Sequence, residues 1–334
     1  MGRIWPSGAP SGKHTIVESI MTAFISKRVA YLGPRGTFTE EALLSQPDLA
    51  SGELVEMGSI DAVLEAVDNG QADLGFVPIE NSIEGTVPAT IDSLVFDHDL
   101  YIEREVVHDI HLHLLGLPGT SIESIREVHS YPHALGQCRK FLAAELPAAS
   151  VHAASSTAEA ARLVSESGDA SLAAIAPSAS RDIYGLVTLR ADIEDHGGNQ
   201  TRFLLVGKGV VPSPTGNDKT SVVCFQVKDQ PGSLFSILAE FYARNINLTK
   251  LESRPSKREL GQYCFVIEFN GHVADHDVAD ALVGLKGKLA DLKFLGSFPN
   301  VREAPAPRSR AVPAQDAAWG WLDAIRSQIA DPQE

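Results

Sequence analysis

Short apolar segments alternate with segments of helical periodicity along most of this chain, and this alternation constrains the fold more than any other feature. Residues 29–33 form an apolar run, after which Thr37 and Glu40 have the spacing of a capping box at the start of a helix. Ser59 is placed to cap a second helix, and 72–77 returns as a buried strand. An order of strand, helix, strand and helix predicts a parallel or mixed α/β sheet.

The same order is repeated further along the chain. Strand patterns occupy 105–116, 128–131 and 172–176, and helical patterns occupy 133–145 and the segment that Ser156 opens. The chain then crosses back through 199–207. We therefore expect two α/β lobes, made of 29–104 with 190–208 and of 105–189, with a ligand-binding cleft at their junction.

A linker and a second, smaller domain follow. Residues 209–218 contain two prolines and two glycines, which is typical of a linker. Residues 219–299 show the order βαββαβ, the ferredoxin-like split motif. At the two ends, we expect 1–28 to be a disordered leader or an extension, and 300–334 to be a Pro- and Ala-rich tail that can form a short helix.

Composition excludes several classes of partner. The chain has 334 residues, 44% of them hydrophobic, which is enough for two or three domains with cores. The formal net charge is −15 and no basic run is interleaved with aromatic residues, so neither a nucleic acid nor a membrane is expected as a partner. Three cysteines without a CxxC spacing indicate neither a disulfide framework nor a zinc site, and they favour a cytoplasmic protein.

The segment Asn-Gln-Thr-Arg-Phe at 199–203 places a hydroxyl beside a permanent cation where an apolar run begins. The guanidinium of Arg202 can hold a carboxylate while the hydroxyl of Thr201 donates to a second oxygen of the same small acid. Taken alone, the segment is equally consistent with a surface turn that enters an edge strand.

Two loops offer further polar groups. Gly36 and Thr37 precede a helix whose free N–H groups can face a carboxylate, although a structural tight turn explains them as well. The loop lacks the Lys-Ser/Thr end of a P-loop, so a nucleotide site is not predicted. Glu80, Asn81 and Ser82 directly follow a strand, which places them at the ligand-binding edge of the sheet unless they only cap a helix.

Two histidines raise the question of a metal. His111 and His113 alternate in a predicted strand and share a face. No third His or Cys ligand lies at a suitable spacing, so we interpret them as strand packing and predict no metal site. Ser156 and Thr157 have the pattern of ordinary helix caps.

Several separated motifs, taken in order, resemble those of the prephenate dehydratase family. They lie at 31–38, 78–86, 131–138 and 199–203, and the resemblance spans 29–299. In 219–299, Pro-Gly-Ser-Leu at 231–234 and Glu-Ser-Arg-Pro at 252–255 resemble the family's regulatory ACT domain, with Ser233 at a position where the family often has alanine. The resemblance implies a two-lobed catalytic region like that of type II periplasmic binding proteins, followed by a ferredoxin-like ACT domain.

The resemblance also implies a set of site residues. Thr201 is expected to contact the leaving hydroxyl, and Arg202 to fix a carboxylate or brace the loop. Further substrate-binding residues are expected, from their positions, at Gly36, Thr37, Glu80, Asn81, Ser82, Gly85, Thr86, Ser156, Thr157, Asn199 and Phe203. An allosteric site is expected at Gly232, Ser233, Leu234, Glu252, Ser253, Arg254 and Pro255.

The activity that the resemblance implies is the decarboxylating dehydration of prephenate to phenylpyruvate, water and CO₂ in phenylalanine biosynthesis. Neither a metal nor an organic cofactor is required. L-Phenylalanine is the expected effector, and a homodimer or homotetramer formed through the ACT domains is the expected assembly. No fused chorismate mutase is expected, because no long helical segment precedes Val29. Two alternatives stay open: an arogenate dehydratase, and a non-catalytic sensor of an aromatic acid.

Overall fold

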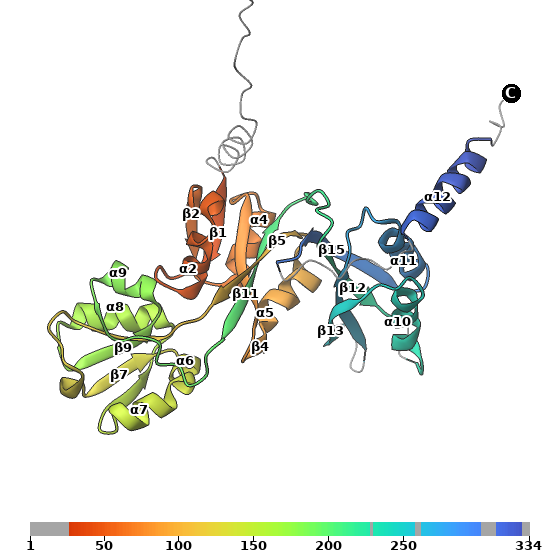
Figure 1. Ribbon diagram of the computed structural model, residues 1–334. Helices are drawn as coiled ribbons and strands as arrows, with labels where there is room; N and C mark the ends of the chain where they lie inside the picture. The colour runs from red at the N-terminus through yellow and green to blue at the C-terminus, as the bar shows by residue number, and fades with distance from the viewer. Residues whose placement is uncertain (1–26, 228–229, 258–261, 302–311, 329–334) are drawn as a thin grey trace, which may run out of the picture. The chain divides into compact units, whose positions relative to one another are not determined.

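The computed structural model describes residues 27–227, 230–257, 262–301 and 312–328 (Figure 1). The leader expected at 1–28 lies outside the described residues except for Lys27 and Arg28, and Arg28 begins the first strand.

The first lobe is built on a six-stranded sheet in the order β2-β1-β3-β11-β5, with β4 paired to β3. Its strands are β1 (Arg28–Leu32), β2 (Glu53–Met57), β3 (Leu74–Asn81), β4 (Gly85–Thr86), β5 (Tyr101–Asp109) and β11 (Gln200–Gly207). Its helices are α2 (Phe38–Leu44), α3 (Pro47–Ala50), α4 (Ile60–Asp68), α5 (Pro88–Asp92) and the π-helix η1 (Ser93–Asp97). As the sequence predicts, Thr37 and Ser59 are the N-caps of α2 and α4.

The second lobe is built on a five-stranded sheet in the order β10-β6-β9-β7-β8. Its strands are β6 (His113–Gly116), β7 (Glu127–Ser130), β8 (Ser150–Ala153), β9 (Leu172–Ala176) and β10 (Val187–Arg190). Its helices are α6 (Pro132–Gln137), α7 (Arg139–Glu145), α8 (Thr157–Ser167), α9 (Ser178–Tyr184) and the 3-10 turn η2 (Ile122–Ser124).

The two lobes share one strand order. In the first lobe β1 lies between its parallel neighbours β2 and β3, and in the second lobe β7 lies between β8 and β9 in the same way. Two antiparallel strands then extend each sheet, β11 and β5 in the first lobe and β6 and β10 in the second. This arrangement confirms the predicted two-lobed α/β architecture.

The boundary between the lobes differs from the predicted one. The second lobe was expected to begin at residue 105, but β5 continues to Asp109, which pairs with Gln200 of β11. Only residues 110–112 separate β5 from β6 of the other sheet. Two strands of different sheets that follow so closely look like one extended segment in the sequence, because both have the same side-chain periodicity.

The second domain has the predicted ferredoxin-like order. Its elements are β12 (Asp218–Phe225), α10 (Ser233–Ala243), β13 (Leu248–Pro255), β14 (Tyr263–Asn270), α11 (His276–Lys286) and β15 (Asp291–Pro299). The antiparallel sheet has the order β13-β14-β12-β15, and the predicted linker, 209–218, contains neither helix nor strand before Asp218. We call residues 218–299 the ferredoxin-like domain.

Both faces of this domain's sheet pack against other elements. On one face, Ile237 and Phe241 of α10 belong to a core cluster with residues of β12 and β14. On the other face, Val223 and Val266 belong to the same core cluster as Ile102 of the first lobe. The ferredoxin-like sheet therefore packs against its own helices on one side and against the first lobe on the other, and every residue of β12 is buried.

A glycine allows the closest approach between the two domains. Gly296 of β15 has a φ of +145°, and a Cβ atom added there would lie 2.5 Å from the carbonyl oxygen of Ile102 in β5. No side chain fits at that separation. Glycine at this position therefore lets the backbones of β15 and β5 come into contact.

The cysteines are buried free thiols, as expected from their spacing. Cys264 of β14 pairs with Phe225 of β12, so Cys224 and Cys264 lie on neighbouring strands. Burial raises the pKa of both Cys138 and Cys224 to about 12, which keeps these thiols protonated.

In the tail, the structure describes residues 312–328, which contain the predicted short helix as α12 (Val312–Arg326). Throughout the described residues, no helix combines the length and the hydropathy that crossing a bilayer requires.

Candidate functional site

Thr201 lies at the edge of the first sheet where β3 ends. In the register of β11 and β3, Thr201 pairs with Asn81, the last residue of β3. Because β11 runs antiparallel to β3, the start of one strand meets the end of the other. The two polar segments singled out in the sequence are therefore neighbours in space, although 120 residues separate them.

The Asn81 side chain has a defined orientation. Its carbonyl oxygen Oδ1 accepts hydrogen bonds from the backbone N–H groups of Ile83 and Glu84, at 2.9 and 3.1 Å. Its amide nitrogen Nδ2 then donates to Thr201 Oγ1 at 2.9 Å and to Asn199 Oδ1 at 2.8 Å. A flipped amide would lose all of these bonds, so the turn after β3 fixes which atom faces Thr201.

This orientation decides what the Thr201 hydroxyl does. A hydroxyl has one proton to donate and two lone pairs to accept with. Since Thr201 Oγ1 accepts from Asn81, its own proton is directed elsewhere and is available to a ligand. Thr201 is partly exposed, which gives a ligand access to that proton.

The network continues into the second lobe. Asn199 is 3% exposed, and its Nδ2 donates to Gln137 Oε1 of α6 at 3.0 Å. Ser82 Oγ donates to Asn199 Oδ1 at 3.3 Å and accepts from the backbone N–H of Gln200 at 3.0 Å. Because Gln137 accepts with its oxygen, its amide N–H groups are left for a ligand. Gln137 was not among the predicted site residues, although it is the next-to-last residue of the motif at 131–138.

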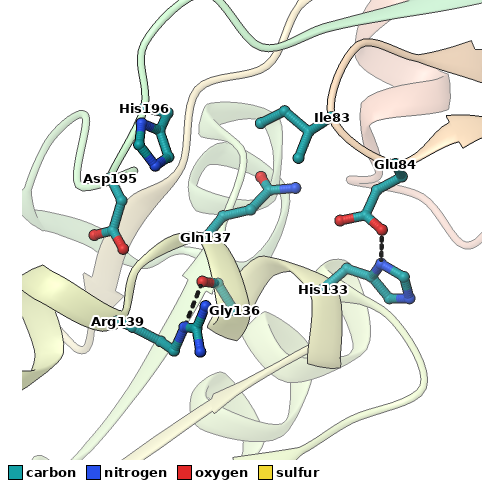
Figure 2. A pocket seen from close by; sticks show the side chains of 8 residues that line it. All are labelled: Ile83, Glu84, His133, Gly136, Gln137, Arg139, Asp195 and His196. Atoms are coloured by element: carbon teal, nitrogen blue, oxygen red, sulfur yellow. Dashed lines mark hydrogen bonds and ion pairs between the residues drawn. The ribbon is translucent and has the colours of Figure 1, made fainter.

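A pocket of about 280 Å³ lies at the junction of the lobes, beside this network (Figure 2). Its size is near the lower end for small-molecule sites, roughly 300–1,000 Å³. It is lined by Ile83, Glu84, His133, Gly136, Gln137, Arg139, Asp195 and His196. These residues come from the turn after β3, from α6 and α7, and from the segment that leads to β11, so both lobes contribute.

A His–Glu pair and an arginine characterise this pocket. His133 Nδ1 lies 2.7 Å from Glu84 Oε2, which joins the second lobe to the first across the pocket (Figure 2). Arg139 Nε donates only to the carbonyl oxygen of Gly136, at 3.2 Å, and forms no ion pair within the described part of the chain. Arg139 is therefore a cation that faces the pocket without a carboxylate of its own.

Other residues predicted to bind substrate have structural partners. The Gly36 N–H donates to Glu40 Oε2 at 2.6 Å, and the Gly36 carbonyl accepts from Ser180 of the second lobe at 2.6 Å. Thr37 caps α2. Ser156 caps α8 by accepting from the N–H of Glu159 at 2.9 Å, and Thr157 is the buried first residue of that helix. The capping roles that residue type alone indicated are thus present.

Phe203 lies in the core. It is 1% exposed and its ring stacks on Phe76 with the centroids 5.2 Å apart. A ring with so little exposed surface offers none to a ligand. Phe203 was expected to bind substrate, but the structure places it in the core next to the polar pair, where it supports β11.

Arg202 points away from Thr201, into the contact between the first lobe and the ferredoxin-like domain. Successive side chains of a strand point to opposite faces. The Arg202 guanidinium lies 2.7 Å from Glu105 of β5 and donates to Glu268 of β14 at 2.9 Å. Lys219 of β12 also donates to Glu105, at 2.7 Å. Of the two roles expected for Arg202, this geometry favours bracing the strand over holding a substrate carboxylate.

These four groups, Arg202, Glu105, Glu268 and Lys219, form a buried ion cluster. The side chain of Glu105 is 1% exposed and that of Arg202 9%. Burial alone would raise the pKa of Glu105, but Arg202 and Lys219 outweigh it, so the pKa is lowered. Burial would lower the pKa of Arg202, yet Glu268 and Glu105 outweigh it and the pKa is raised. Arg202 and Glu105, which both belong to the first lobe, are therefore both charged.

Glu80 and Thr86 belong to the same contact between domains and not to the pocket. Thr86 Oγ1, next to Gly85 in β4, donates to Glu252 Oε2 of β13 at 2.7 Å. Lys250 of β13 donates to Glu80 Oε2 at 3.2 Å and to Thr86 Oγ1 at 3.1 Å. Successive side chains of a strand point to opposite faces, so Asn81 and Glu80 lie on opposite faces of β3, as Thr201 and Arg202 do on β11.

The motif at 252–255 is divided between two faces of β13. Glu252 contacts Thr86, and Arg254 donates to Asp92 of α5 through Nε at 3.0 Å. Ser253 and Pro255 are exposed. Half of this motif is therefore bonded to the first lobe, and the other half is open to a ligand or a second chain.

The motif at 231–234 lies at the same end of the ferredoxin-like sheet. Phe225, at the end of β12, pairs with Cys264, which also pairs with Arg254 near the end of β13. The chain leaving β12 leads to Gly232, the N-cap of α10, which has a φ of +87°. Ser233 begins α10, and Leu234 is partly buried against the core of the domain. The predicted allosteric residues are thus gathered at one end of the domain.

This geometry is accompanied by likeness to known proteins. The family model for prephenate dehydratase matches residues 29–210, and the model for the ACT domain matches residues 220–287. The prephenate dehydratase of Amycolatopsis methanolica is 42% identical over 305 residues, which cover 90% of this chain and 98% of that protein. The crystal structure of the prephenate dehydratase of Arthrobacter aurescens in complex with L-Phe has a TM-score of 0.83 and 38% identity, covering 90% of this chain and 99% of that one. The prephenate dehydratase of Staphylococcus aureus subsp. aureus Mu50 has a TM-score of 0.71 and 29% identity, covering 81% of this chain and 99% of that one.

The buried ion cluster predicts a large effect of neutralising Glu105. Glu105→Gln leaves Arg202 and Lys219 partly uncompensated, and should lower the free energy of unfolding by about 3–5 kcal/mol at pH 7. Urea denaturation followed by circular dichroism measures this change. The matched control is Glu166→Gln, which removes an exposed partner of Arg162 in α8 and should cost less than about 1 kcal/mol.

The pH dependence of this loss in the free energy of unfolding tests whether the charge of Glu105 causes it. Because the pKa of Glu105 is lowered by folding, its contribution is present above the carboxyl's unfolded pKa of about 4.3 and is lost as the pH falls further. The difference between wild type and Glu105→Gln should therefore shrink below about pH 4. A difference that stayed constant from pH 7 to pH 3 would mean that packing, and not charge, is lost.

Proposed function

The chain belongs to the prephenate dehydratase family, and we propose that Thr201, Gln137 and Arg139 carry out the family's reaction in this protein. Prephenate dehydratase is a carbon–oxygen lyase of phenylalanine biosynthesis. Prephenate loses its ring hydroxyl as water and its ring carboxylate as CO₂, and the aromatic product is phenylpyruvate.

The reaction places two demands on the site. Hydroxide is a poor leaving group, so the departing oxygen must receive a hydrogen bond or a proton. The carboxylates must be held without over-stabilising the one that becomes neutral CO₂. Formation of the aromatic ring supplies the driving force, so the chemistry itself calls for neither a metal nor an organic cofactor.

Thr201 is the proposed donor to the leaving oxygen. The observation that carries this assignment is the bond from Asn81 Nδ2 to Thr201 Oγ1, because it directs the threonine proton away from Asn81. A threonine hydroxyl is a weak acid, so it acts by orienting and donating a hydrogen bond. Asn81, Asn199 and Ser82 hold it in place and are proposed as positioning residues.

Arg139 and Gln137 are the proposed ligands of a substrate carboxylate. The guanidinium of Arg139 lines the pocket without an ion-pair partner among the described residues. Gln137 lines the same pocket and accepts from Asn199 of the Thr201 network, which leaves its amide N–H groups for a ligand. Arg202 is proposed to brace β11 from the opposite face, since its guanidinium is bonded to Glu105 and Glu268.

L-Phenylalanine is the proposed effector. The relative from Arthrobacter aurescens was crystallised with L-Phe, and this chain has an ACT domain. Gly232, Ser233, Leu234, Ser253 and Pro255 are proposed to form its site, because they lie at one end of the domain on its open side. Glu252 and Arg254 are proposed to transmit binding, because they bond to Thr86 and Asp92 of the first lobe.

A second copy of the chain is the proposed partner. β13 is an edge strand of its sheet, so its outer hydrogen-bonding groups can pair with another chain. Phe235 and Tyr242 lie seven residues apart on α10 and are 74% and 87% exposed, and Leu251 of β13 is 45% exposed. This apolar surface at a strand edge supports a homodimer or homotetramer formed through the ACT domains. The buried free thiols support the cytoplasm as the compartment.

The first prediction for this function concerns Thr201. Thr201→Val keeps the shape but removes the donor, and should lower kcat for prephenate by about 10²- to 10⁴-fold. Thr201→Ser keeps the hydroxyl and should retain much more activity. Turnover is measured separately with prephenate and with arogenate. Near wild-type turnover by the Val variant with unchanged folding would remove Thr201 from the chemistry, and faster turnover of arogenate would favour the alternative substrate.

The second concerns Arg139. Arg139→Gln removes the pocket's unpaired cation and should raise KM for prephenate by about 10- to 100-fold, the value of a charge-assisted hydrogen bond. The control is Lys140→Gln, which removes the same charge from the adjacent residue, outside the pocket lining. Equal KM values for the two variants would show that only net charge matters and that Arg139 does not contact substrate.

The third concerns Arg254. Arg254→Met should leave phenylalanine binding intact by calorimetry but weaken inhibition, because the bond to Asp92 is lost. Effector coupling is ordinarily about 5- to 150-fold, and this factor should fall toward one. The control is Arg244→Met, whose partners Glu240 and Asp280 lie within the ferredoxin-like domain. Full inhibition of the Arg254 variant would place the coupling elsewhere, and inhibition strictly competitive with prephenate would place phenylalanine in the catalytic pocket.

A further inference from the structure

The two lobes are joined by two chain segments that run side by side. Residues 110–112 lead from β5 to β6, and residues 191–199 lead from β10 back to β11. The N–H of Ile110 donates to the carbonyl of Asn199, and the N–H of Ile193 donates to the carbonyl of Leu112, both at 2.8 Å. Any change in the angle between the lobes must bend these two segments.

A histidine and two carboxylates meet across these segments. His111 Nδ1 in the first segment lies 3.2 Å from Glu194 Oε1 and 3.4 Å from Asp192 Oδ1 in the second. The three ligand atoms all lie within 4.8 Å of one another. His111 and Asp192 are exposed, so an ion from solution can reach them.

The spacing suits a tetrahedral metal. With metal–ligand bonds of about 2.1 Å, the edge of a tetrahedron between two ligand atoms is about 3.4 Å. Both distances from His111 match this edge. One imidazole and two carboxylates are ligands that zinc accepts, and three protein ligands leave the fourth position to water.

The surroundings of the site hold the ligands in place. The side chain of Glu194 is 7% exposed, and its Oε2 accepts from the backbone N–H of Leu112 at 3.0 Å, which turns Oε1 toward His111. A carboxylate so little exposed is stabilised by a nearby cation. His113 Nδ1 accepts from the backbone N–H of Asp192 at 3.2 Å, so it orients the Asp192 loop and is not itself a free ligand.

We propose that His111, Asp192 and Glu194 form a site for a divalent transition metal of the zinc class, which links the two segments that join the lobes. The site lies outside the catalytic pocket, and the dehydration does not use it. Glu194 directly precedes Asp195 and His196, which line that pocket. A metal at this position therefore restrains the hinge and fixes the pocket-lining part of the second segment.

The sequence did not indicate this site because it offered no third His or Cys near His111 and His113. The missing ligands are carboxylates from a segment 83 positions later, as the separation of His111 and Glu194 shows. They reach the histidine only because the chain returns from the second lobe beside the segment by which it entered.

Cobalt(II) titration of the full chain after treatment with EDTA tests the proposal, since tetrahedral cobalt has a visible absorption that zinc then abolishes by displacement. We expect one equivalent to bind, and zinc to raise the melting temperature. His111→Ala and Glu194→Gln should each weaken cobalt binding by at least about 10-fold. Replacing a residue that only supports a metal ligand already costs about 10- to 100-fold in metal affinity, so loss of a ligand should cost no less. Should either variant fail to fold, Asp192→Asn at an exposed position provides the same test.

A second histidine pair provides the control. His129 and His152 stack with their centroids 4.9 Å apart beside Glu127, at the edge of the second sheet. His152→Ala should leave cobalt binding unchanged. Loss of binding in this variant with retention in His111→Ala would overturn the proposal, as would the absence of any cobalt absorption or zinc-dependent shift in melting temperature in the wild-type chain.

Discussion

The ion pair between Arg202 and Glu268 connects the strand that carries Thr201 to the sheet of the ferredoxin-like domain. A guanidinium that is 9% exposed at its side chain requires carboxylates nearby, and Glu105 and Glu268 supply them from two different domains. Arg202 follows Thr201 directly in β11, so the same backbone that positions the hydroxyl on one face positions the cluster on the other. Separation of the two domains would leave these charges buried and unpaired, or expose them together with the apolar surface around them.

The packing around this cluster joins apolar and charged contacts on one face of the ferredoxin-like sheet. Beside the ion cluster, this face shares a core cluster with Ile102 and other residues of the first lobe. Under the proposed assignment, phenylalanine at one end of this sheet would bind to a body that already contacts β4, β5 and β11. A small shift of β13 would move Glu252 and Arg254, which bond directly to Thr86 and Asp92 of the first lobe. No flexible linker lies between these partners.

The sequence predicted those parts of the site that depend on where strands end. Asn81, Ser82, Asn199 and Thr201 were expected at one sheet edge, and they form one hydrogen-bonded network; their roles in binding substrate stay predictions. The two-lobed fold and the βαββαβ domain were also confirmed. Arg202 and Glu80 adjoin this network in sequence, but strand alternation turns their side chains to the opposite face, toward the ferredoxin-like domain. Gln137 and Arg139 were not predicted, because their place at the pocket depends on how the second lobe faces the first, which no local pattern encodes.

The strand order also bears on how this protein folds during synthesis. β11 lies between β3 and β5, yet it leaves the ribosome after the whole second lobe has been made. Until then β3 and β5 have no partner between them, and each presents an unpaired edge rich in apolar residues. The second lobe is complete before the first, because all of its strands lie between the two halves of the first sheet. The second lobe can thus be completed while the first sheet still lacks β11, and the edges of β3 and β5 are exposed to aggregation and to chaperones until β11 inserts.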